Sequence, residues 1–136
     1  MLAAVVLLAV LQTADGTDVA ASFSGYARGE RWEFKITRTM LAAAPAWEET
    51  ELSPPLPPRR AIAIAASQLA ELLPDSSRWR FNSVSLHQIG GGNRLVYVVE
   101  YGGPPPRPVG GMTMERMPII VLMSGATVVP VRSPWP

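Results

Sequence analysis

Two runs rich in β-branched and aromatic residues, separated by a short glycine cluster, constrain the fold of this chain more than any other feature. They occupy residues 78–89 and 94–101, and the sequence Gly-Gly-Gly-Asn lies between them. Glycine and asparagine tolerate positive φ angles at little cost, so the chain can reverse direction between Gln88 and Arg94. The pattern predicts an antiparallel β-hairpin.

The segments around this hairpin predict one helix and three further strands. Residues 59–73 place apolar side chains at helical spacing, with prolines before and after them. Residues 31–40 alternate as a half-buried strand does, and residues 117–123 and 127–132 read as a second hairpin that turns at Ser124-Gly125-Ala126. We interpret residues 15–29 as a linker and residues 41–58 as a connecting loop. The expected fold is α+β, with one helix on an antiparallel meander of four to five strands.

The strand expected at residues 95–101 is apolar on both of its faces. Tyr97, Val99 and Tyr101 alternate with Val96 and Val98, and residues 119–123 repeat this pattern. A strand in a sheet with one solvated face should instead alternate apolar with polar residues. We therefore expect the second face to be covered by the N-terminal apolar run or by a second copy of the protein, or to be an interaction surface.

Composition and motifs argue against several classes of function. The 12 basic and 11 acidic residues nearly cancel and are interspersed, so no basic face for nucleic acid is evident. The absence of cysteine excludes disulfides, thiolate metal sites and a cysteine nucleophile. His87 is the sole histidine, and we expect it to face solvent. No hydrolase, zinc or phosphate-loop motif is present. The sequence predicts a protein without enzymatic activity, cofactor, metal or evident small-molecule substrate.

The N-terminal segment predicts export. Residues 1–11 form an apolar run of the length typical of a signal peptide and too short to span a membrane. No basic residue precedes the run, and the small residues Val19-Ala20-Ala21 offer a cleavage site downstream. We interpret residues 1–21 as a signal peptide and residues 22–136 as a single periplasmic or extracellular domain without a membrane span. The alternative is that the run is retained and anchors an accessory or structural subunit.

Candidate binding residues come from the aromatic residues and from a long proline-rich loop. Residues 102–116 exceed the usual length of a connection within a domain, and Pro105 and Arg107 lie in this loop. Trp79, between two arginines, is the best candidate for an exposed aromatic side chain, and Tyr97 and Tyr101 could add to a stacking surface. These five residues are the predicted contacts to a protein partner or a second copy.

Residues 61–131 resemble the PepSY-type, cystatin-like domains of bacterial envelope proteins. The resemblance rests on the alanine-rich helix, the hairpin that ends near Tyr97-Val98-Val99, and a last hairpin with a Ser-Gly turn. The loop at residues 102–116 has no counterpart in that pattern, and neither has the Gln-Val-Gly loop by which cystatins inhibit proteases. The resemblance implies a small exported domain with a binding, inhibitory or accessory role.

Overall fold

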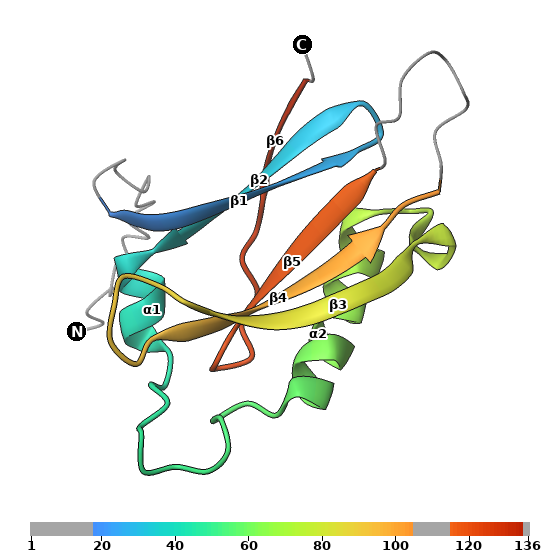
Figure 1. Ribbon diagram of the computed structural model, residues 1–136. Coiled ribbons are helices and arrows are strands. Elements are labelled where there is room, and N and C mark those ends of the chain that lie inside the picture. The colour runs from blue at the N-terminus through green and yellow to red at the C-terminus, as the bar shows by residue number, and fades with distance from the viewer. Residues whose placement is uncertain (1–17, 105–114, 135–136) are drawn as a thin grey trace, which may run out of the picture.

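The computed structural model describes residues 18–104 and 115–134, which form a six-stranded antiparallel sheet with one long helix (Figure 1). The strand order is β3-β4-β5-β1-β2-β6. The elements are β1 (Val19–Ala27), β2 (Glu30–Thr37), α1 (Arg38–Ala43), α2 (Pro58–Leu72), the 3₁₀ turn η1 (Ser76–Arg78), β3 (Arg80–Gln88), β4 (Leu95–Gly102), β5 (Arg116–Leu122) and β6 (Val131–Pro134). The α+β class is confirmed, with more strands than the four to five expected.

The central hairpin and the helix lie where the sequence predicts them. β3 pairs with β4 across the glycine turn, in which Gly90, Gly91 and Gly92 all adopt positive φ. α2 begins at Pro58, whose ring is compatible with the first helical position. Its buried stripe of Ala61, Ala65 and Leu69 faces the sheet. Small side chains on this stripe let the helix lie close to the strands.

The chain before and after this central unit differs from the expectation. The segment at residues 15–29 was expected to be a linker, but its described part forms β1, which pairs with β2 along its length and begins before the expected domain start at Ser22. β2 ends at Thr37 instead of continuing to residue 40, because the Thr37 hydroxyl accepts a hydrogen bond from the Met40 N–H (3.1 Å) and caps α1.

The second hairpin prediction was wrong beyond its turn. The chain does reverse after Leu122, where Gly125 has positive φ and Thr127 bridges back to Val121. Pro130 follows and has no N–H to extend this ladder. The chain then leaves β5, and β6 pairs with β2 at the far edge of the sheet.

The sheet folds over on itself, so that β1 lies against the face of β3 and β4. The pairing of β1 with β5 is at Tyr26 and Arg116. In a flat sheet β1 and β3 would be three strand spacings apart, about 14 Å, yet the rings of Phe23 in β1 and His87 in β3 are 5.3 Å apart. A Cβ added to Gly25 would lie 2.7 Å from both the Arg116 carbonyl and the Pro118 ring. Glycine is thus needed where β1 crosses β5.

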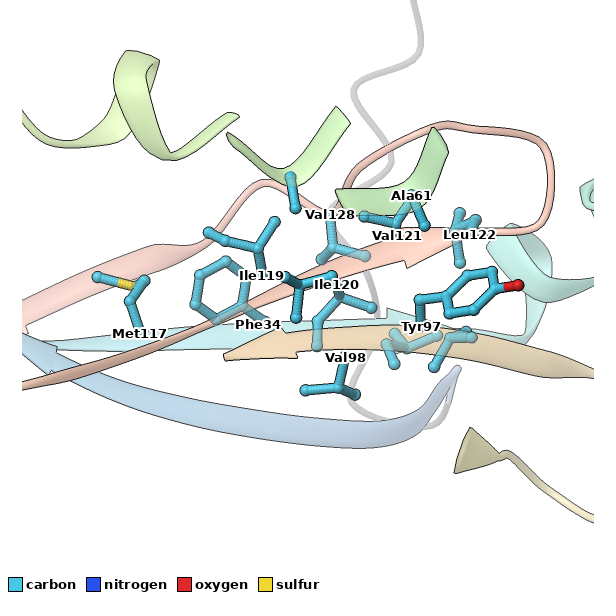
Figure 2. Packing of buried hydrophobic residues seen from close by; sticks show 14 of the residues in the cluster. Phe34, Ala61, Tyr97, Val98, Met117, Ile119, Ile120, Val121, Leu122 and Val128 are labelled. Atoms are coloured by element: carbon cyan, nitrogen blue, oxygen red, sulfur yellow. The ribbon is translucent and has the colours of Figure 1, made fainter. Parts of the chain in front are cut away.

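The two faces of β4 and β5 are both covered within the chain. Figure 2 shows Ala61 of α2 on one side of these strands and Val98 projecting from the other side toward β1. Val98 and Ile120 are 3% and 0% exposed, as core residues are. The doubly apolar pattern is therefore explained by intramolecular packing, and β1 belongs to the cover of the second face.

Candidate binding edge

One edge of the sheet is formed by β3, and it carries the features of a site for strand addition. None of its nine residues is buried, and no described strand lies outside it. Natural proteins protect such edges with lysine, proline, a β-bulge or a very short strand. β3 contains no lysine or proline, and its single charged residue, Arg80, stands at its start. Its register irregularity lies between Phe81 and Ser83 and leaves the segment from Val84 to Gln88 regular. The opposite edge, β6, has four residues and ends in Pro134, so it is protected.

Apolar side chains of β3 project on the face that carries α2. Phe81 stands opposite Tyr101, Val84 opposite Val99, and Leu86 opposite Tyr97. The rings of Phe81 and Tyr101 meet edge to face with centroids 6.1 Å apart. Phe81 is still 47% exposed and Leu86 39% exposed, because α2 packs over β4 and β5 rather than over β3. The edge therefore offers exposed apolar surface beside exposed backbone.

The other face of β3 is polar. Ser83, Ser85 and His87 occupy alternate positions there, and the Ser85 hydroxyl lies 2.9 Å from His87 Nε2. His87 was expected to face solvent, but it is half-buried because Phe23 of β1 covers its ring. The hydrogen bond with Ser85 and the ring contact with Phe23 hold the His87 side chain in place within the fold.

The ladder to β4 determines which backbone groups of β3 point away from the described part of the sheet. The Ile89 N–H donates to the Arg94 carbonyl (3.0 Å) at the end of the hairpin. Hydrogen-bonded and non-hydrogen-bonded pairs alternate along an antiparallel ladder, so Ser85 and His87 bond to β4. Val84 and Leu86 consequently direct their N–H and C=O groups outward. Such groups can accept an additional strand.

The structure places three of the five sequence-predicted contact residues in the core. Trp79 is 7% exposed, in contrast to the exposed position expected for it, and Tyr97 and Tyr101 are 1% and 5% exposed. The indole N–H of Trp79 has no hydrogen-bond partner among the described residues. Pro105 and Arg107 lie outside the described residues, as do the segment at residues 1–17 and most of the loop at residues 102–116.

The two buried tyrosines stabilise the packing of the helical side of the sheet. The Tyr97 hydroxyl donates to the Leu56 carbonyl (2.6 Å) in the segment that leads into α2. Leu56 itself is buried, so both its side chain and its carbonyl anchor the segment before α2 to the core. Burial raises the pKa of both Tyr97 and Tyr101.

Two surface hollows are less suited to a ligand than the β3 edge. One, of about 300 Å³, is lined by Ala20, Arg94 and the glycine turn, but Arg94 already donates to the Leu41 and Ala44 carbonyls that end α1.

The other hollow, of about 500 Å³, lies beside Arg132. The Arg132 guanidinium stacks 5.0 Å from the Trp32 ring centroid and pairs with Glu30. Both arginines thus serve contacts within the fold.

Sequence reasoning located the strand that forms this edge but missed Phe81, Val84 and Leu86 as accessible residues. The alternation of Ser83, Ser85 and His87 with Val84 and Leu86 was a usable signal of one polar face. The position of the strand at an edge was not visible, because strand order depends on pairings between distant segments.

Comparisons of the chain with protein-family models, with curated proteins and with solved structures gave no match. The resemblance to PepSY-type and cystatin-like domains therefore stays a prediction. In residues 18–104 and 115–134, no helix has the length and hydropathy needed to cross a membrane. The same residues contain no cluster of three or more His, Asp or Glu side chains that could hold a metal ion.

Proposed function

We propose that this protein is a small, non-enzymatic, exported domain that acts by binding, and that it binds extended polypeptide at the β3 edge. The observation that carries this proposal is the combination on one strand of exposed apolar side chains and outward backbone groups that no described strand pairs with. In strand addition the backbone hydrogen bonds supply affinity, and alternate side chains supply specificity. A polypeptide partner is favoured over nucleic acid because β3 between Asn82 and Gln88 carries no lysine or arginine.

A cystatin-like or PepSY-like role and export are parts of this proposal. Their support is the sequence resemblance, the N-terminal apolar run and the arrangement of one long helix across an antiparallel sheet. Strand addition differs from the loop insertion of cystatins and does not need the missing Gln-Val-Gly loop.

Selection from a phage-displayed library of short random peptides tests the binding edge. The key variant is Val84→Pro, because this proline removes an outward N–H while the neighbouring Ser85 N–H stays bonded to β4. The matched control is Val129→Pro, which changes a valine that is 74% exposed and lies outside every strand.

We expect the selected peptides to bind the wild type and the Val129→Pro control alike, measured by fluorescence anisotropy. Binding to Val84→Pro should be at least about tenfold weaker, the effect of losing roughly one hydrogen-bonded contact. Peptides that bind all three proteins equally, or a failure to select any peptide, would overturn the proposed edge.

A further inference from the structure

We propose that the polypeptide bound at the β3 edge is β3 of a second copy, in an antiparallel register centred on Ser85. This inference rests on the proposed function and specifies its partner. Two six-stranded sheets would join into one continuous sheet, with the α2 helices of both copies on the same face.

The outward backbone groups of β3, which no described strand pairs with, satisfy this register. Val84 and Leu86 both direct their N–H and C=O groups outward, and a two-fold axis at Ser85 places Val84 of one copy opposite Leu86 of the other. Each of these two pairs exchanges two hydrogen bonds in an antiparallel ladder. The two copies of Ser85 then form the non-hydrogen-bonded pair between them.

The side chains favour the same register over its neighbours. With the axis at Ser85, apolar Val84 meets apolar Leu86 on one face, while polar Ser83 meets His87 on the other. An axis at Val84 would instead set Leu86 against Asn82, and an axis at Leu86 would set Val84 against Gln88. Apolar cross-strand pairs stabilise a sheet more than these mixed pairs do.

Charge does not oppose the self-pairing. Residues 82–88 include no lysine, arginine, aspartate or glutamate, so no like charges face each other across the axis. Arg80 of each copy falls opposite the glycine turn of the other, at the two ends of the interface. Leu86 is 39% exposed in one copy, and in the pair Val84 of the other copy packs beside it.

A covalent trap tests the register. The chain has no cysteine, so Ser85→Cys introduces a single thiol per copy. Opposed residues of a non-hydrogen-bonded antiparallel pair have Cα atoms about 4.5 Å apart, within the range that a disulfide accepts. The control is Ser83→Cys on the same face, whose two copies would lie about 13 Å apart along the strands.

We expect Ser85→Cys in the full chain to form a disulfide-linked dimer with oxidised glutathione at micromolar protein, and Ser83→Cys to stay monomeric under the same conditions. Light scattering of the wild type over a concentration series should show reversible doubling of mass. Leu86→Lys should abolish this doubling, whereas Val129→Lys, at a valine that is 74% exposed, should not.

Equal cross-linking of Ser85→Cys and Ser83→Cys would overturn the register, and a wild type that is monomeric up to millimolar concentration would overturn self-pairing. Peptide binding that is lost in Val84→Pro would then still support the β3 edge as a binding site for a different polypeptide. The failure of the dimer and the failure of the proposed function are thus separate results. Far-ultraviolet circular dichroism of each variant checks that its sheet is intact.

Discussion

At the scale of single residues, the Tyr97 hydroxyl connects the sheet to the lead-in of α2. Its hydrogen bond satisfies the Leu56 carbonyl, and the residue is 1% exposed. Tyr97→Phe keeps the ring but leaves the carbonyl without its partner. We expect the free energy of unfolding at neutral pH to fall by about 1–2 kcal/mol, measured by urea denaturation. An unchanged value would mean that another group satisfies Leu56.

The same tyrosine gives stability an alkaline limit. Because burial raises the pKa of Tyr97 above 10.0, the folded state keeps the phenolic proton at a pH where the unfolded state has lost it. The stabilisation is complete below pH 10 and is lost as the pH rises from there through the raised pKa. Tyr97→Phe should therefore show a shallower fall of stability above pH 10 than the wild type. The remaining slope should include Tyr101, whose pKa burial also raises.

At the scale of elements, the distance between α2 and the sheet is set by alanine. Ala65 is 0% exposed and belongs to the stripe that meets β4 and β5, whereas the adjacent Ala66 is exposed. Ala65→Leu inserts a side chain where no space exists and should cost about 1–3 kcal/mol of unfolding free energy. Ala66→Leu adds the same atoms on the solvent side and should change it by less than about 0.5 kcal/mol. Equal costs would contradict the observed orientation of the helix.

The elements also show which parts of the fold the sequence can predict. The β3–β4 hairpin and α2 are specified by local signals, namely a glycine turn and an apolar stripe between prolines, and both were predicted. β1 escaped prediction because only glycine fits where it crosses β5, so Gly25, together with the small alanine and serine residues of this strand, resembles a linker. A strand was predicted at residues 127–132, but the pairing of β6 escaped prediction because its partner, β2, lies about a hundred residues earlier in the chain.

The candidate binding edge likewise has features that local sequence signals predict and features that depend on distant parts of the chain. Its strand and its alternating polar face could be predicted from residues 80–88. Its accessibility could not, because it depends on where α2 packs and on which strands occupy the edges. The aromatic residues chosen from the sequence were buried for the converse reason: Trp79, Tyr97 and Tyr101 supply the large side chains that fill the core.

At the scale of the whole molecule, the crossing of β1 over β5 joins the two halves of the sheet. A methyl group at Gly25 would meet the backbone of Arg116 and the ring of Pro118, both at 2.7 Å. Gly25→Ala should therefore lower the free energy of unfolding by about 1–3 kcal/mol, although alanine is otherwise the better strand residue. Ser24→Ala on the same strand, with its side chain on the other face, should cost less than about 0.5 kcal/mol. Thermal unfolding of the three proteins provides the comparison.

Hydrogen exchange across the whole sheet should display the free edge directly. β4 is paired along its length with β3 on one side and with β5 on the other, and most of its side chains are buried, so its amides should exchange slowest. In β3 the ladder predicts alternation: the Ser85 and His87 amides, bonded to β4, should be protected, and those of Val84 and Leu86 should exchange rapidly in dilute protein. Raising the protein concentration should then protect Val84 and Leu86 selectively, because self-pairing uses those two amides. Slow exchange of all four amides in dilute protein would mean that the edge is already covered within one copy, and β3 would then not be a binding site.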